Sequence, residues 1–417
     1  MRNELIVAIV MFLISIGGSI ATRNDKKWSV LFLFIAAVAG SLVAGMGVRF
    51  REIVEGPFGF LDSLLCVCAA SVLVAVLDRS GAFVLLYSKI SKVRFGVLRA
   101  FLVLLFIALP SMLTGFATSS LLTTGKLVRN LLEKQGEKKA PVIVAVGAFL
   151  GVLLPPNCIP AIIAANGAGS VLPTPYSGFF LPLLVVALPA FIAYALMEYR
   201  TLASLEEAEM HDRGAAAALI VLALVMVAVI IEGVLSSFIW LGGNTLVFFI
   251  ATLLVLVLTR FFGSAKETLD TVSDGLMKAV VPMAIVFALG SFIEVSSMTG
   301  VRGMFSYWIL GYSTTGVMLV LMAASLIIGY FFSIPIPAFL ITYAVFPIGW
   351  LANTVTVTGC SVVLAVIALV TRRGGIMENS GLKHTEVLKN VCVPASLVLV
   401  MGVLLVVFGD KLSFLIV

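Results

Sequence analysis

The chain has 417 residues, of which 61% are hydrophobic and only 12% are charged, and its mean hydropathy is +1.18. So little polar surface cannot keep a soluble globular domain in water, and the composition therefore predicts an all-α polytopic membrane protein. The net charge of +6 would suggest a nucleic-acid partner in a soluble protein, but in a membrane protein basic residues mark the side on which a loop lies, so no nucleic acid is expected.

Ten stretches are apolar over about 17–25 residues, which is long enough to cross the lipid bilayer as a helix. In chain order these predicted spans are 3–22, 28–48, 57–78, 140–170, 177–198, 214–232, 244–260, 276–295, 350–371 and 388–409.

Two further apolar stretches, 97–125 and 312–348, fit single spans poorly. Basic residues flank the first stretch on both sides, so both of its ends are predicted to lie in the cytoplasm and the stretch to form a re-entrant hairpin. The second stretch lies in a region without any charged residue between 303 and 370. By chain order both its ends fall outside, which predicts a second hairpin that enters from the opposite face.

The distribution of basic residues supports this layout. Of the 27 lysines and arginines, 22 fall in segments assigned to the cytoplasm and 5 in segments assigned to the outside. Since basic residues are enriched in cytoplasmic loops, the split predicts the orientation, with both termini external.

An internal repeat is predicted from paired glycines. Gly56 and Gly81 are 25 residues apart, as are Gly275 and Gly300, and the two pairs are offset by 219 residues. Because charge places Gly56 outside and Gly275 inside, the repeats would be inverted, although chance pairing of glycines is the alternative. The predicted organisation is 1–48 (N-terminal scaffold spans), 49–198 (repeat 1, with hairpin 97–125 and broken helix 140–170), 199–267 (linker and spans) and 268–417 (repeat 2, with hairpin 312–348 and helix 350–371).

The tip of the first hairpin combines Pro110 and Gly115 with a cluster of hydroxyl side chains. Proline removes a backbone donor and glycine permits unusual dihedrals, so carbonyl oxygens are freed beside the hydroxyls, and such hard oxygens suit Na⁺. The alternative is a kinked membrane helix whose Ser and Thr side chains bond back to its own carbonyls. The predicted ion-binding residues are Thr114, Gly115, Thr118 and Ser119, and Thr118 and Ser120 are also predicted to contact the substrate.

A second polar break, Pro155-Pro156-Asn157, lies near the middle of the stretch 140–170. A proline pair destabilises an uninterrupted helix, so a discontinuous helix is predicted, whose second half would point the positive end of its dipole at an anion. Pro156 and Asn157 are therefore predicted to bind the ion, and Asn157 the substrate as well. Ser333 and Pro335 break the second hairpin and are also predicted to bind an ion.

Together these motifs resemble the large membrane subunit of tripartite ATP-independent periplasmic (TRAP) transporters. They are the hydroxyl-rich tip, the basic loop Lys126–Lys139, Gly151-Val-Leu-Leu-Pro-Pro-Asn157 and Gly178-Phe-Phe-Leu-Pro182. The resemblance runs from about residue 50 to the C-terminus. It implies an elevator-type, Na⁺-coupled symporter for carboxylates in the bacterial inner membrane, which works with a small membrane subunit and a periplasmic substrate-binding protein.

The second half departs from the family pattern at two places. Ser333 stands where the family commonly has an acidic residue, and Thr371-Arg-Arg-Gly-Gly375 replaces Thr-Pro-Pro-x-Gly. An arginine at a broken helix would pair with a substrate carboxylate through two hydrogen bonds, so Arg372 is a predicted substrate-binding residue. The alternative is that Arg372 and Arg373 only anchor the cytoplasmic end of the span 350–371.

The leading hypothesis is Na⁺-coupled symport of a small organic anion, such as a dicarboxylate or a sugar acid. Neither predicted hairpin contains a carboxylate, which favours Na⁺ over H⁺ as the coupling ion, and no other cofactor is expected. A stand-alone carrier of the same superfamily, possibly coupled to H⁺, and a passive channel are the alternatives. An intramembrane enzyme is disfavoured because both histidines, His211 and His384, lie in polar segments.

Overall fold

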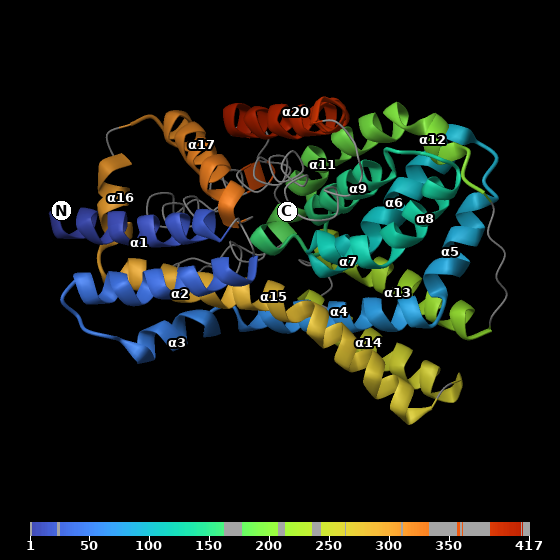
Figure 1. The fold of residues 1–417 in the computed structure, drawn as a ribbon, viewed down its shortest axis with the longest axis horizontal. Helices are drawn as coiled ribbons and strands as arrows, with labels where there is room; N and C mark the ends of the chain where they lie inside the picture. The colour runs from blue at the N-terminus through green and yellow to red at the C-terminus, as the bar shows by residue number, and fades with distance from the viewer. Residues whose placement is uncertain are drawn as a thin grey trace.

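The computed structural model describes residues 2–22, 26–161, 177–206, 213–235, 243–262, 264–309, 312–332, 357–358, 361, 384–409 and 411. Within these ranges every regular element is a helix (Figure 1). The helices are α1 (Arg2–Ala21), α2 (Lys26–Val43), α3 (Phe50–Phe58), α4 (Leu61–Arg79), α5 (Ala82–Ser91), α6 (Gly96–Thr114), α7 (Ala117–Leu122), α8 (Thr124–Lys134), α9 (Ala140–Leu153), α11 (Ser177–Met197), α12 (Tyr199–Ala203), α13 (Arg213–Leu235), α14 (Gly243–Phe262), α15 (Ala265–Met298), α16 (Val301–Ile309), α17 (Thr314–Phe332) and α20 (His384–Phe408).

Seven of these helices are long and apolar enough to cross a membrane: α1, α4, α6, α11, α13, α15 and α20. The predicted spans 28–48, 140–170 and 244–260 contain α2, α9 and α14, whose apolar helical stretches are shorter. The fold is therefore that of a multi-pass membrane protein. Most of the predicted span 350–371 lies outside the described residues.

Two groups of helices build the molecule. In the α4–α15 group, α4 packs against α14 and α15, α15 also packs against α2 and α3, and α1 packs on α2. In the α6–α9 group, α6 packs against α9, α11 and α12, while α7 and α8 cover α9. Every residue of α9 is buried, which explains why its sequence is apolar on all sides.

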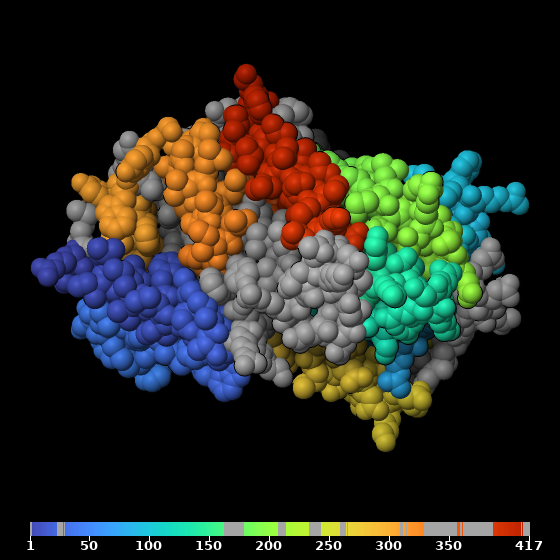
Figure 2. Space-filling model, turned by 45° about the horizontal axis from the view of Figure 1, so that its top comes forward, coloured from blue at the N-terminus to red at the C-terminus, as the bar shows by residue number. Residues whose placement is uncertain are grey.

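Other helices connect the two groups. α5 contacts both α4 and α6, and α13 contacts both α14 and α11. α20 packs against α11 and α17, and Figure 2 shows it lying between α17 and the α11 side of the molecule. The ends of the molecule also differ: α3, α16 and the N-terminus lie at one end and α5, α8 and α12 towards the other (Figure 1).

Elements that differ by about 219 residues have similar forms. α5 begins at Ala82 and α16 at Val301, and each follows a glycine in the left-handed region, with φ of 76° at Gly81 and 77° at Gly300. The close approaches are reciprocal as well. Gly56 lies against the backbone of Gly290, and Gly275, its counterpart, lies against the backbone of Ser71 and Val72, at the counterpart of Gly290.

Three segments differ from the sequence-based expectation. The predicted span 57–78 is divided, because the chain turns at Gly59 and Phe60 between α3 and α4. The predicted span 276–295 is only part of α15, which has 34 residues. The predicted basic loop Lys126–Lys139 is also wrong in its first half, where α8 is an amphipathic helix that buries Val128 and Leu132 against α9 and exposes its basic side.

Candidate functional site

A sharp turn at Gly115 ends α6 and sends the chain back along it. Gly115 has a φ of 76°, a value that L-residues other than glycine rarely adopt, and its N–H donates to the carbonyl oxygen of Ser111 at 2.7 Å. The chain continues through α7 and α8, and both of these helices pack against α6. The turn therefore lies at the tip of a helical hairpin whose second arm is interrupted at Thr123.

The hydroxyl groups of the tip are hydrogen-bonded to one another and to the freed backbone. Thr114 Oγ1 donates to the carbonyl oxygen of Pro110 at 2.8 Å and also lies 2.8 Å from Ser119 Oγ. The N–H of Ser111, which faces Pro110 rather than a regular helical partner, donates to Ser120 Oγ at 2.8 Å. These bonds join α6 to α7, so the polar side chains fix the shape of the tip.

The second polar cluster interrupts the helix that begins with α9. α9 ends at Leu153, the five residues 154–158 are not helical, and helical residues resume at 159. Asn157 is fully buried in this break. Its side-chain Nδ2 donates to the carbonyl oxygen of Leu113, and its backbone N–H donates to that of Met112 at 3.3 Å. The break is thus hydrogen-bonded to the end of α6.

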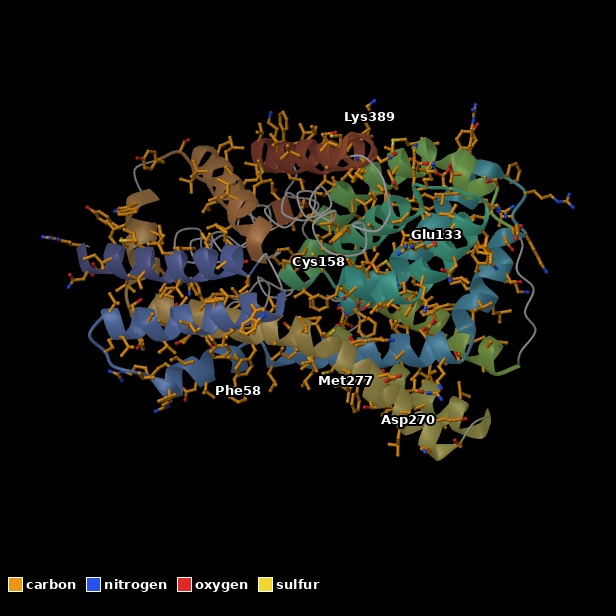
Figure 3. The ribbon with its side chains drawn as sticks, in the orientation of Figure 1. Phe58, Glu133, Cys158, Asp270, Met277 and Lys389 are labelled. Carbon is orange, nitrogen blue, oxygen red and sulfur yellow. The ribbon has the colours of Figure 1, made fainter. Side chains whose placement is uncertain are left out.

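The tip and the break lie in direct contact. A Cβ atom added to Gly115 would overlap the carbonyl oxygen of Asn157 and the side chain of Ile159. Before the break, a Cβ atom on Gly151 would lie 2.6 Å from the carbonyl oxygen of Ala108 in α6. Glycine at both positions allows the backbones to approach this closely. Cys158, next to Asn157, lies near the middle of the molecule in Figure 3.

The structure brings most of the predicted first-half site residues together. Thr114, Gly115, Ser119, Ser120, Pro156 and Asn157 all belong to the tip or to the break against it. Thr118 is different, since its side chain is exposed on α7 and makes no hydrogen bond within the described ranges. The predicted site residues Ser333, Pro335 and Arg372 lie outside the described residues, as does Arg373.

Two residues that the sequence did not mark reach the break from the α4–α15 group. Cys66 Sγ, on α4, donates to Asn157 Oδ1 at 3.3 Å, and Asn244 Nδ2, on α14, donates to the carbonyl oxygen of Pro156 at 3.3 Å. Their partners are 91 and 88 residues away in sequence. Asn244 begins the predicted span 244–260, where a polar residue has the same pattern as a helix cap, so no local signal identifies it.

The chemistry of this arrangement is that of neutral oxygen atoms. The tip and the break offer hydroxyl, amide and carbonyl oxygens, and the described ranges contain no group of three or more His, Cys, Asp or Glu residues suited to a metal. Neutral oxygens bind hard monovalent cations and donate or accept single hydrogen bonds. The residues present therefore fit Na⁺ better than a transition metal.

Comparisons with known proteins bear on this geometry. The family described as the tripartite ATP-independent periplasmic transporter, DctM component, matches residues 72–371, which is more than half of the chain. The fold is similar to that of the Alcanivorax borkumensis YdaH transporter, whose crystal structure is described as having an unusual topology. That similarity has a TM-score of 0.60 at 14% sequence identity and covers 93% of this chain and 98% of the other. None of the curated proteins matches the sequence.

Proposed function

Because the chain belongs to the family of the DctM component of tripartite ATP-independent periplasmic transporters, we propose that it moves a small organic anion by Na⁺-coupled symport. Membership makes the chain a membrane transporter rather than an enzyme and implies secondary transport of organic acids. The finer proposal concerns the coupling ion and the class of anion, a dicarboxylate or a sugar acid.

The contact between the hairpin tip and the helix break carries this proposal. Gly115 touches the carbonyl of Asn157, and hydroxyl and carbonyl oxygens of both elements surround that contact. In lipid, non-helical backbone at membrane depth survives only where it is buried in protein or lines a cavity. Two such segments in contact, without any carboxylate between 110 and 120 or between 151 and 161, suit a neutral-oxygen cation site.

The proposal includes an inverted repeat and an elevator movement. The matched positions of α5 and α16, and the reciprocal approach of Gly56 to Gly290 and of Gly275 to Ser71, support two repeats over 49–198 and 268–417. The α6–α9 group would move along the α4–α15 group and carry the site with it. The hairpins 97–125 and 312–348 would open the site to opposite sides of the membrane in turn.

The setting of the transporter is also part of the proposal. The family works with a small membrane subunit and a periplasmic substrate-binding protein, and the chain would do so in a bacterial inner membrane with both termini external. The separation of α3, α16 and the N-terminus from α5, α8 and α12 supports this orientation, because the second set carries far more of the lysines and arginines.

Uptake into proteoliposomes tests the proposal. The purified chain is reconstituted with and without the small subunit and the binding protein, and labelled dicarboxylates and sugar acids are offered under an inward Na⁺ gradient, an inward H⁺ gradient or neither. Saturable accumulation that requires the Na⁺ gradient is the expected result. Accumulation driven by the H⁺ gradient alone would contradict Na⁺ coupling, and non-saturable flux without any gradient would indicate a passive channel.

A further inference from the structure

Two hydrogen bonds connect the α4–α15 group to the helix break. Cys66 Sγ donates to Asn157 Oδ1, and Asn244 Nδ2 donates to the carbonyl oxygen of Pro156, each over 3.3 Å. Both acceptors lie in the non-helical residues 154–158, where the regular helical bonding pattern is interrupted. The two side chains therefore contact the part of the site that is least constrained by its own helix.

Cys66 fixes which way the amide of Asn157 faces. The terminal torsion of an asparagine side chain is soft, so its oxygen and nitrogen are easily exchanged or turned. Here Nδ2 donates to the carbonyl oxygen of Leu113 at the end of α6, while Oδ1 accepts from Cys66. Because Cys66 supplies a donor and Leu113 an acceptor, only one orientation of the amide satisfies both neighbours.

Asn244 holds the neighbouring carbonyl. Its Nδ2 bonds to Pro156, while its Oδ1 is buried and has no hydrogen-bond partner in the described part of the chain. A leucine of similar volume would not bury an unpaired oxygen, so packing alone does not account for an asparagine here. The donor that it provides to Pro156 is the contact that an apolar residue would lose.

We propose that Cys66 and Asn244 are positioning residues for the ion site, a proposal that rests on the function proposed above. They hold the Asn157 amide and the Pro156 carbonyl in the orientation in which both meet the hairpin tip. Since the two residues belong to the other group of helices, these bonds form only at the relative position of the groups described here. The affinity of the site for a cation therefore depends on where the α6–α9 group stands.

Binding of Na⁺ alone provides the first test. The purified protein is heated in detergent with increasing Na⁺, choline replacing it at constant ionic strength, and the half-saturating Na⁺ concentration is read from the rise in melting temperature. Cys66→Ala and Asn244→Ala should each raise that concentration about fivefold, which corresponds to about 1 kcal/mol for one lost hydrogen bond. Cys66→Ser keeps a donor and should stay near the wild type.

Two variants control for general loss of packing. Thr252 donates to the carbonyl oxygen of Ala69 at 3.0 Å, so Thr252→Val removes an α14–α4 hydrogen bond away from the break. Cys68→Ala removes the neighbouring thiol, which contacts Met283 on α15. Neither should change the half-saturating Na⁺ concentration. If Thr252→Val raised it as much as Asn244→Ala does, or if Cys66→Ala left it unchanged, the positioning role would be wrong.

Alkylation of Cys66 separates this inference from the proposed function. A wild type that Na⁺ does not stabilise would contradict the proposed coupling ion, and the positioning contacts can then still be measured. In a protein with the other four cysteines replaced by alanine, Cys66 is 2% exposed and should react slowly with N-ethylmaleimide. Asn244→Ala should accelerate the reaction several-fold because it loosens the break, whereas Thr252→Val should not. Equal rates in these two variants would overturn the inference.

Discussion

Gly115→Ala should uncouple the hairpin tip from the helix break. The φ of 76° at Gly115 would cost an alanine roughly 1–2 kcal/mol, because its Cβ would crowd the adjacent carbonyl. The same Cβ would also overlap the carbonyl oxygen of Asn157 and the side chain of Ile159, and forcing a methyl into a packed interior costs roughly 1–3 kcal/mol more. The total destabilisation should be about 2–5 kcal/mol.

Gly136→Ala is the matched control for this variant. Gly136 has nearly the same dihedral, with a φ of 79°, but a Cβ atom there would meet nothing within 4 Å. It should therefore show the backbone strain without the overlap. We expect melting in detergent and Na⁺-driven uptake to be clearly impaired in Gly115→Ala and nearly normal in Gly136→Ala. Equal losses in both variants would refute the contact between tip and break in the working protein.

Three further variants test other parts of the structure. Ser120→Ala leaves the buried N–H of Ser111 without its acceptor and should destabilise the protein by about 1–3 kcal/mol, measured as a lower melting temperature. Thr118→Ala should leave the melting temperature unchanged because its side chain is exposed and makes no hydrogen bond among the described residues, so any rise in the half-saturating substrate concentration would report a direct contact with the anion. Burial raises the pKa of Glu198 above its usual 4.5, an effect that Lys139 opposes and Glu137 reinforces, so the folded protein binds this proton more tightly than the unfolded chain and loses stability as the pH rises through that window. Glu198→Gln should therefore melt at a higher temperature than the wild type at neutral pH, with the difference vanishing below the usual pKa, and a difference that does not depend on pH would contradict this.

The sequence predicted the local features of the site better than its surroundings. Gly115 and the pair Pro155-Pro156 break helices wherever they occur, so the turn and the break could be placed without a structure. That the tip lies directly on the break depends on the packing of α6 against α9, in which Gly151 permits the close approach. An apolar pattern indicates that both segments are buried but not which segments meet.

Contacts between distant segments and changes of helix direction were not predictable. Asn244 and Cys66 become site residues only because α14 and α4 pack together beside the break, and neither position has a periodicity that marks it. The division of the span 57–78 was missed for a different reason, because the turn at Gly59 lies in an uninterrupted apolar run and hydrophobicity does not record a change of direction. In α8 the basic residues masked an amphipathic helix whose apolar side faces α9.

The hydrogen bonds of the tip bear on the choice between Na⁺ and H⁺. A hydroxyl has one hydrogen, so if Thr114 donates it to the carbonyl oxygen of Pro110, the 2.8 Å contact with Ser119 must have Ser119 as its donor. Both lone pairs of Ser119 Oγ then remain available, while those of Thr114 face Ser119 and the N–H of Phe116. A cation could use the oxygen of Ser119 without breaking this network. A proton has no comparable place, because hydroxyl and amide groups do not accept one near neutral pH and residues 110–120 and 151–161 include no carboxylate or imidazole. The geometry of the tip thus favours a metal cation over a proton as the ion that this half of the molecule would carry.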